Sequence, residues 1–533
     1  MRLLLALLVG VFCSLGFLWF TEIPLGIPGE WTWKRIGDND AAGLVETMLG
    51  LIGGLVAGAV YVGFCWLGVR RIGNAGRGEQ SAWLAGFTLV AMLFLFTGQL
   101  ATREDLANLK WAWVLFDPSA SGYFHDSLTS DLDTRAFLAD FERKMSEGDV
   151  FHIGTHPPGL FLMNRALLAG CRESELLRDY ALMTQPDSVR EAFDIIEYRV
   201  HVLQKNERPR IITQAERAAL WLSVLLTHFF AAATVVPLFL LIKSDFETQA
   251  AWKAAAFWPL VPALLVFLPK SDALLPFWGM SFLACWQVAV KRRSYVLAGI
   301  GGLIFWVGMN LSLAIVPVGF LAVLLTVWNT LVVPNLDVSL GRRVRESALL
   351  AATALAIFLM ATWFLYWEYD LNLFHVWAWN VSNHAGFYER SGFSRTWWKW
   401  LLVNPLELML AIGWPLFLLG IVRLVNRKKR EQGESSNDGT FDWRARETGI
   451  VFCCLATWGL LWLSGKNMGE AARLWLFLMP WWCWMSGWFW SPEQTIDKSK
   501  SPLQIRFWLG VLTLQLVVCL FTISRVSGFH FGG

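Results

Sequence analysis

Carboxylates, a histidine and a tyrosine gather in one short segment, FDPSASGYFHDSLTSDLD, which begins at residue 116 and follows an apolar run. A carboxylate beside an apolar wall keeps its proton to a higher pH than usual, which suits a general base. Asp117 and Asp126 are therefore candidate bases. Each of them alone also fits a solvated helix cap or turn, where Asp is common. The clustering, more than any one residue, indicates chemistry.

A second candidate, His156, stands further along the chain in the segment HIGTHPPG. Pro157 and Pro158 lack backbone donors and fix the direction of the chain, so they can start a helix and aim His156 into a cavity. The simpler interpretation is a helix start with an incidental histidine. His152 lies four residues earlier, but the two prolines disfavour a continuous helix through both histidines, which argues against a shared metal.

The triplet Asp131-Leu132-Asp133 has the D-x-D spacing with which many sugar-transferring enzymes hold a divalent cation. Asp131 and Asp133 are therefore the candidate metal ligands of this sequence. A pattern of three residues occurs often by chance, and solvated turn residues also explain it. A divalent metal is the one cofactor that the sequence suggests.

Cationic and polar side chains recur in three other short segments between apolar runs. These are LPKSDALL with Lys270 and Asp272, NVSNHAGFYERSGFSR with His384, and GKNMGEAARLW with Lys466, Glu470 and Arg473. Lys and Arg neutralise phosphate oxygens, while a carboxylate takes a proton from a hydroxyl. If these turns meet the Asp-rich segment, they form a site for a phosphate together with a hydroxyl. Singly, such residues are often only interfacial anchors at the ends of spans.

The elements that must position these residues are membrane helices. Of the 533 residues, 55% are hydrophobic and 16% are charged. Apolar runs repeatedly reach the length of a bilayer crossing, which excludes a soluble globular protein, and a net charge of +3 gives no argument for nucleic acid. The sequence predicts an all-α, polytopic transmembrane bundle of about 13 spans. They lie near 3–20, 44–67, 81–100, 217–242, 254–268, 273–290, 295–309, 311–333, 347–366, 401–423, 448–464, 474–490 and 504–524.

The spans divide the chain into three parts and predict its orientation. N-terminal spans occupy 1–100, a loop with the candidate motifs occupies 101–216, and a bundle with short outer loops occupies 217–533. If the stretch 295–333 is split as a hairpin near Asn310, alternate loops hold about 19 and about 9 Lys or Arg. The positive-inside rule then places the richer set in the cytoplasm. All candidate site residues fall together on the opposite, non-cytoplasmic face.

The loop at 101–216 is too long to lack structure of its own. In its stretch 134–147, the apolar residues Phe137, Leu138, Phe141 and Met145 recur at helical spacing. We therefore expect short amphipathic helices that lie on the membrane surface.

Together these features resemble the GT-C superfamily of integral membrane glycosyltransferases, which includes the protein O-mannosyltransferases and the aminoarabinose transferases. Asp117 with Tyr123 is similar to the acidic opening motif of that family, and His156-Pro157-Pro158 is similar to its His/Lys-Pro-Pro element. The turn with Glu470 and Arg473 is similar to a late phosphate-contacting loop. Pro118 stands where a second acid often follows, and Gly159 stands where Leu is usual.

The resemblance implies an inverting transfer of a sugar from a polyprenyl-phosphate carrier to an acceptor hydroxyl. It implies Asp117 as the base, with Asp126 and the D-x-D pair as alternatives, His156 beside it, and Arg473 as a phosphate ligand. Substrate binding falls to Tyr123, Asp272, His384, Lys466 and Glu470. The implied partners are the lipid-linked donor, membrane lipids and a glycan, lipid or protein acceptor, and the implied location is the bacterial inner membrane with the site on its periplasmic or extracellular side.

A competing class is a multi-span transporter or lipid flippase. It predicts ionisable residues deep in the spans and an internal repeat. The sequence has few charges deep in its apolar runs and no convincing repeat, which favours the enzyme.

Overall fold

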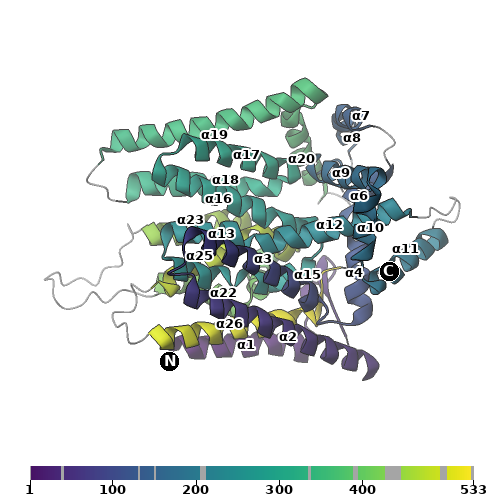
Figure 1. Ribbon diagram of the computed structural model, residues 1–533, viewed down its shortest axis with the longest axis horizontal. Coiled ribbons are helices and arrows are strands. Elements are labelled where there is room, and N and C mark those ends of the chain that lie inside the picture. Colours follow the sequence, from purple (N-terminus) through teal and green to yellow (C-terminus); the bar gives the residue numbers. More distant parts are fainter. Residues whose placement is uncertain are drawn as a thin grey trace.

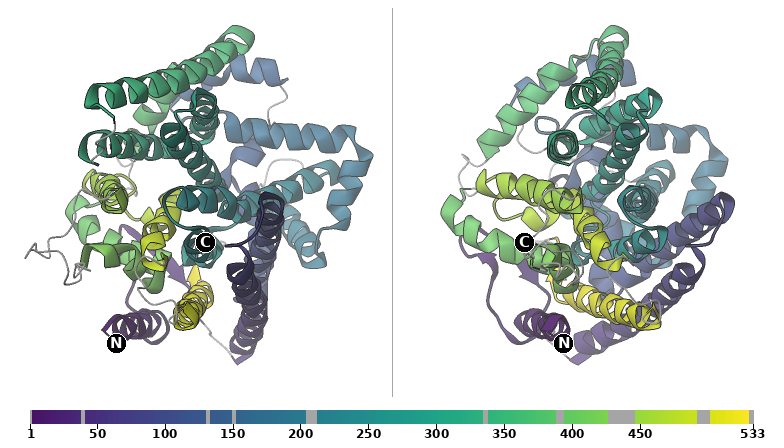
Figure 2. Two further views of the ribbon diagram at one scale, coloured as in Figure 1. Left: turned by 60° about the vertical axis from the view of Figure 1, so that its left-hand side comes forward. Right: turned by 90° about the vertical axis from the view of Figure 1, so that its left-hand side faces the viewer.

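The chain folds into a bundle of long helices that run along one axis, with shorter helices over one end (Figure 1). The structure is a computed structural model that describes residues 2–37, 41–129, 133–148, 152–203, 212–333, 338–387, 394–425, 446–491 and 501–529. Figure 2 shows the same bundle from two further sides. The predicted all-α, polytopic membrane fold is confirmed.

Within the described residues, eight helical segments are long and apolar enough to cross a membrane. All of them coincide with predicted spans. They are α1 (Arg2–Phe20), α2 (Ala41–Arg71), α3 (Arg77–Gln99), α12 (Gln214–Ala233) with α13 (Val235–Asp245), η2 (Ser271–Leu274) with α16 (Leu275–Arg292), η3 (Leu313–Ile315) with α18 (Val316–Val327) and η4 (Trp328–Val332), α19 (Leu340–Tyr369), and α26 (Ser501–Ile523).

The other predicted spans have helical counterparts that are shorter, bent or interrupted. α21 (Trp397–Ile412) and α22 (Trp414–Val425) form one candidate span that bends by 104° at Gly413, where φ is +87°. Prolines interrupt two more spans because they cannot continue a helical hydrogen-bond ladder. The remaining elements are α14 (Thr248–Ala255), η1 (Trp258–Leu260), α15 (Pro262–Phe267), α17 (Tyr295–Leu311), α23 (Arg446–Leu463), α24 (Ala471–Leu474), η5 (Leu476–Leu478) and α25 (Pro480–Trp490).

The predicted hairpin near Asn310 is confirmed. α17 ends at Leu311, Ser312 is extended, and its hydroxyl accepts a hydrogen bond from Ala314 N–H to start the next helical turn. Beyond the turn, a Cβ added to Gly319 would lie 2.7 Å from the ring of Phe305 on α17. The chain therefore folds back on itself at this turn.

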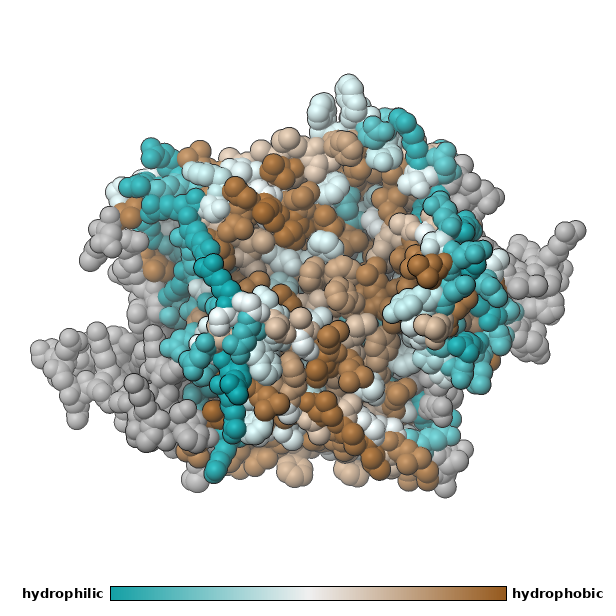
Figure 3. Space-filling view, in the orientation of Figure 1, coloured by the Kyte–Doolittle hydropathy of each residue, from teal (hydrophilic) through white to brown (hydrophobic). Residues whose placement is uncertain are grey.

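The face of the molecule in Figure 3 carries an apolar belt between two polar bands, as expected of a protein that crosses a bilayer. α19 is the most exposed of the long helices, and only 11% of its most apolar window is buried. Its outward side chains are large and apolar, including Met360, Trp363 and Phe364. In a bilayer these side chains face lipid.

The predicted cytoplasmic loops meet at one end of the bundle, the Asp245 end. The carboxylate of Asp245 is 1% exposed and lies 2.9 Å from both Lys291 Nζ and Arg446 Nε. Trp484 Nε1 donates to its second oxygen at 3.0 Å. Arg293, two residues after Lys291, pairs with Glu346 at 2.8 Å, and Arg342 pairs with the same carboxylate at 2.9 Å. Loops that hydropathy places on one side of the membrane are thus joined by charge.

Short helices from the loop at 101–216 cover the opposite end (Figure 1). The helical prediction for 134–147 is confirmed as two helices, but their apolar faces are not on the membrane surface. Phe137, Phe141 and Met145 are fully buried, and the two phenylalanines pack on Phe161. The helices are α4 (Glu104–Phe116), α5 (Pro118–Ser121), α6 (Tyr123–Thr129), α7 (Thr134–Ala139), α8 (Phe141–Ser146), α9 (Gly159–Glu173), α10 (Glu175–Met183), α11 (Asp187–Leu203) and, from a later loop, α20 (Leu373–Phe387).

A small antiparallel sheet joins the first outer loop to the end of the chain. β1 (Leu25–Ile27) and β2 (Trp31–Arg35) form a hairpin, with Leu25 opposite Trp33, and β3 (Val526–Ser527) pairs with β2. Gly26 and Gly29 have φ of +137° and +81°, which only glycine adopts without strain. The sheet lies at the end of the bundle that carries α4 to α11.

Candidate active site

Polar side chains from distant parts of the chain meet at the end opposite Asp245. We call Tyr123, His156, Lys270, Asp272, Glu470 and Arg473 the polar cluster. His384 and Lys466 lie at its edge. Of the residues proposed from sequence, the structure brings these eight together, because α6, the start of α9, the η2 turn, the end of α20 and the α24 turn converge there.

Arg473 is the centre of the cluster. Its guanidinium lies 3.8 Å from the Asp272 carboxylate on η2 and 3.0 Å from the Glu470 carboxylate in its own turn. The three side chains are between 13% and 20% exposed, so a ligand can reach them while much of their surface is dry. In such a site, hydrogen bonds to an anion are stronger than in water.

Tyr123 links the opening motif to the η2 turn. Its ring packs edge-on against His152, His156 and Phe161, with centroids 5.3, 5.2 and 5.2 Å away. Burial raises the pKa of Tyr123 well above its usual value, and the Asp272 and Asp126 carboxylates add to this. The Arg473 charge and a hydrogen bond with Ser271 oppose the rise. Tyr123 therefore stays a neutral phenol beside the cations.

His156 and Lys270 are less charged than their residue types suggest. Burial lowers the pKa of His156 to about 3, and the charges of His152, His384, Lys270 and Arg473 act in the same direction. Burial and the Arg473 charge lower the pKa of Lys270 to about 7, against the opposite effect of Asp272 and Glu470. At neutral pH, His156 is thus a neutral hydrogen-bonding group, and Lys270 is near its titration point.

The predicted helix start after Pro157 and Pro158 is confirmed, since α9 begins at Gly159. A Cβ at Gly159 would overlap the carbonyl oxygen of Asn310 at the end of α17. Leucine, which is usual at this position of the motif that the sequence resembles, would overlap it too. Glycine at this position lets the His156 loop dock on the α17 hairpin.

α20 fixes the same loop from the other side. Asn383 Nδ2 donates to the carbonyl oxygens of Met145 and Gly154, at 3.0 and 2.9 Å. Next to it, His384 hydrogen-bonds the Asn467 side chain. Burial and the Lys466 charge lower the pKa of His384. The end of α20 therefore joins the His156 loop to the turn that carries Lys466.

The two candidate bases differ in their relation to the cluster. Asp126 lies on α6 with its carboxylate 3.7 Å from His125 Nδ1, and its charge acts on Tyr123. Asp117 ends α4, and its carbonyl oxygen accepts hydrogen bonds from Ala120 and Ser121 N–H, both at 3.0 Å. Both residues lie at the end of the bundle that carries the polar cluster. The charge of Asp126 acts on Tyr123, which links α6 to the cluster.

Of the D-x-D pair, the structure describes only Asp133. Asp131 lies outside the described residues. The Asp133 carboxylate accepts the Ala136 N–H at 2.8 Å and so caps α7. Among the described residues, no group of three or more His, Cys, Asp or Glu side chains is arranged to hold a metal ion.

Several residues around the cluster were not proposed as site residues from sequence. His152 Nε2 accepts the Gly122 N–H at 2.9 Å and holds the turn before Tyr123. Glu407 lies inside a predicted span, and its Oε1 accepts hydrogen bonds from Trp33 and from the Ala472 N–H. An acid inside an apolar span is costly unless it has partners, so Glu407 could have been singled out on that ground.

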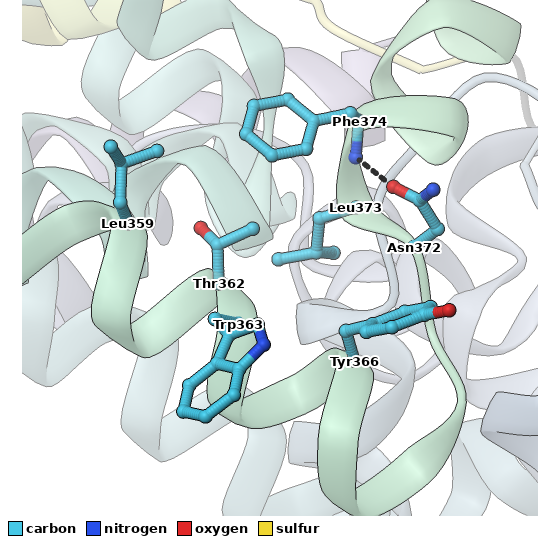
Figure 4. A pocket seen from close by; sticks show the side chains of 7 residues that line it. All are labelled: Leu359, Thr362, Trp363, Tyr366, Asn372, Leu373 and Phe374. Carbon is cyan, nitrogen blue, oxygen red and sulfur yellow. Dashed lines mark hydrogen bonds between the residues drawn. The ribbon is translucent and has the colours of Figure 1, made fainter.

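A groove of about 320 Å³ lies where α19 meets α20, apart from the polar cluster. Its side chains are mostly apolar and include Trp363, Tyr366 and Phe374 (Figure 4). The Asn372 side chain accepts the Phe374 N–H at 3.1 Å and caps the start of α20. None of the groove residues belongs to the polar cluster.

Comparison with known proteins adds only a distant structural similarity. No protein-family model and no curated protein matches the chain. Among solved structures, it is similar to the Archaeoglobus fulgidus oligosaccharyltransferase in complex with zinc and sulfate, with a TM-score of 0.43 and 13% sequence identity. The match covers 83% of this chain and 54% of that one, so this chain spans about half the length of that protein. A similarity this weak carries no functional argument, and the function must be inferred from the residues of the site.

Proposed function

We propose that the protein is a membrane glycosyltransferase that moves a sugar from a polyprenyl-phosphate donor to an acceptor hydroxyl. The observation that carries this proposal is the convergence of Arg473, Lys270 and neutral His156 with carboxylates at the end of the apolar bundle. A lipid-linked donor suits this geometry because its tail can lie in the bilayer while its phosphate lies at the interface.

In the proposed step, the acceptor oxygen forms a bond to the anomeric carbon as the bond from that carbon to the phosphate oxygen breaks. The phosphate leaves with the electron pair and is bound by Arg473 and Lys270, with hydrogen bonds from His156 and Tyr123. A carboxylate of the opening motif, Asp126 or Asp117, takes the acceptor proton. Attack from the face opposite the phosphate inverts the configuration.

The acceptor is a hydroxyl on a glycan, a lipid or a protein, and the site faces the non-cytoplasmic side of the membrane. Asp272 and Glu470 hold the Arg473 guanidinium between them, while His384 and Lys466 line the edge where the acceptor enters. This assignment gives each of the eight converging residues a role at the phosphate or beside it.

The competing transporter or flippase draws little support from the deep polar residues of the bundle. His228 is fully buried in α12, but both of its ring nitrogens have protein partners, Gln99 Nε2 at 2.6 Å and the Val224 carbonyl oxygen at 2.9 Å. Its ring also stacks on Phe96 at 3.9 Å. A residue engaged on every side is better suited to packing than to a path for substrate.

Arg473 provides the sharpest test of the proposed function. We expect Arg473→Ala to lower the rate of transfer from a polyprenyl-phosphate donor by about 10²-fold or more, the scale of one lost hydrogen-bond donor in a catalytic site, and to weaken donor binding. Arg473→Lys should also be impaired, because Lys replaces a planar fork with a point charge. The measurement is transfer against donor concentration in reconstituted vesicles. If transfer by Arg473→Lys depends on donor concentration as it does in the wild type, Arg473 is only an interfacial anchor and the proposed phosphate site is wrong.

A further inference from the structure

The hairpin formed by β1 and β2 is tied to the start of α21, although its sequence indicated no chemistry. The Glu30 carboxylate at its turn accepts hydrogen bonds from Thr396 N–H (2.8 Å), Thr396 Oγ1 (2.6 Å), Lys399 Nζ (3.1 Å) and Trp400 Nε1 (2.9 Å). Burial alone would raise the pKa of Glu30, but these hydrogen bonds lower it to about 2. An ionised carboxylate at a helix N-terminus also satisfies free backbone donors and the helix dipole.

Further along α21, Glu407 joins the hairpin to the turn that carries Arg473. A single oxygen, Oε1, accepts hydrogen bonds from Trp33 Nε1 on β2 and from the Ala472 backbone N–H, both at 2.9 Å. Ala472 directly precedes Arg473 in α24. Glu407 thus binds the backbone one residue before Arg473, whose guanidinium lies at the centre of the polar cluster.

The same turn is held from a second side by close packing. Gly469 has φ of +85°, and a Cβ there would lie 3.0 Å from the Trp31 Cβ and 3.0 Å from the Trp400 ring. Trp31 belongs to the hairpin, and Trp400 is one of the residues that hold Glu30. The backbone from Gly469 to Ala472 therefore rests on the hairpin at one point and on Glu407 at another.

We propose that Glu407 is the positioning residue for Arg473 and that Trp33 orients Glu407. By fixing the Ala472 N–H, the Glu407 oxygen sets the direction in which the next side chain leaves the backbone. Asp272 and Glu470 pair with the guanidinium, and Glu407 holds the backbone one residue before it. The inference rests on the proposed function in one respect, namely that Arg473 binds the phosphate of the donor.

Three variants of the full-length protein in detergent test this role. Glu407→Ala removes the acceptor, Glu407→Gln keeps an amide oxygen in its place, and Trp33→Phe removes only the indole N–H. The first measurement is hydrogen exchange of the backbone amides at 465–475, which does not depend on activity. We expect exchange to be at least about tenfold faster in Glu407→Ala and to be largely restored in Glu407→Gln, since an amide oxygen still accepts the hydrogen bond.

The second measurement is the binding of polyprenyl phosphate as a probe. Affinity should fall about tenfold in Glu407→Ala, by less in Trp33→Phe, and the double variant should be no worse than Glu407→Ala, because both groups act through one oxygen. Trp367→Phe, at a 73% exposed tryptophan on α19, is the matched control for loss of an indole N–H. If Glu407→Ala does not fold, both measurements are made on Trp33→Phe instead.

The outcomes separate this inference from the proposed function. Unchanged exchange at 465–475 in Glu407→Ala, or in Trp33→Phe if that variant must stand in, overturns the positioning role. Equal impairment of Glu407→Gln and Glu407→Ala also overturns it, since the hydrogen bond would then not matter. A wild-type protein that does not bind polyprenyl phosphate overturns the proposed function instead, while the exchange data still decide the role of Glu407.

Discussion

Lys270 differs from the other cations of the cluster because its charge depends on pH near neutrality. Arg473 is charged at every physiological pH, whereas the buried Lys270 has a pKa of about 7. Below that pH, Lys270 and Arg473 offer a phosphate two positive charges, and above it only Arg473 offers one. A bound phosphate favours the charged form and so raises the pKa of Lys270 further.

We therefore expect donor affinity to be constant below about pH 7 and to fall as the pH rises above it. If bound phosphate raises the pKa of Lys270 by one unit, affinity falls about tenfold in total. Binding of a polyprenyl-phosphate-linked sugar between pH 6 and 9 measures this effect, because a phosphodiester keeps a single negative charge over that range. Lys270→Arg keeps its charge over that range and should give a flat profile. A wild-type profile as flat as that of Lys270→Arg would show that Lys270 does not contact the phosphate.

The base is the second open point at this scale. Loss of a proton-transfer group usually lowers the rate by about 10²-fold or more, so either Asp126→Asn or Asp117→Asn should lose that much transfer activity while still inserting in the membrane. The link of Asp126 to Tyr123 leads us to expect the larger loss there. Single-turnover rates for the two variants compare them directly. Near-normal rates in both would remove the proposed mechanism.

Short motifs and residue types indicated all six members of the polar cluster. Tyr123, His156, Asp272 and Arg473 were proposed from short motifs, because chemistry restricts the residue types that serve it. The neutral state of His156 was not predictable, since it follows from burial and from cations that are distant in sequence. The hydrogen bond between Glu407 and Ala472 was not predictable either, because a contact between separate helices leaves no pattern in the local sequence.

At the scale of elements, hydropathy located the spans but not their breaks. A window of apolar residues is the same for a straight helix and for the 104° bend between α21 and α22. Proline positions indicate where a helix stops, but not where the chain goes next. The pairing of β2 with β3 was also missed, because these strands are far apart in the chain and sheet pairing over that distance has no local signal.

The close approach of α9 and α17 makes a direct prediction for Gly159. Gly159→Leu should weaken the His156 loop, because its side chain would overlap the Asn310 carbonyl oxygen. The backbone must then shift, at a cost of about 1–3 kcal/mol, the usual range for overpacking. Thermal unfolding in detergent should detect the loss, together with weaker donor binding. Gly63→Leu, where a Cβ meets nothing within 4 Å, is the matched control and should leave both quantities unchanged.

For the whole molecule, the structure groups the loops into two ends. The Lys and Arg distribution predicts that the Asp245 end is cytoplasmic. Single cysteines at the exposed positions Ala385, near the polar cluster, and Ser339, in a basic loop, test this orientation. In intact cells, an impermeant thiol reagent should label the cysteine at 385 and not the one at 339. The reverse pattern would place the site in the cytoplasm.

The Asp245 end also bears on how the chain is made. Translation supplies Asp245 and Lys291 well before Arg446 and Trp484. Until Arg446 and Trp484 are added, the Asp245 carboxylate lacks both of these partners. A polypeptide that stops before Arg446 would keep this defect permanently. Packing at this end therefore depends on residues from widely separated parts of the chain, and a polypeptide truncated between them would leave it incomplete.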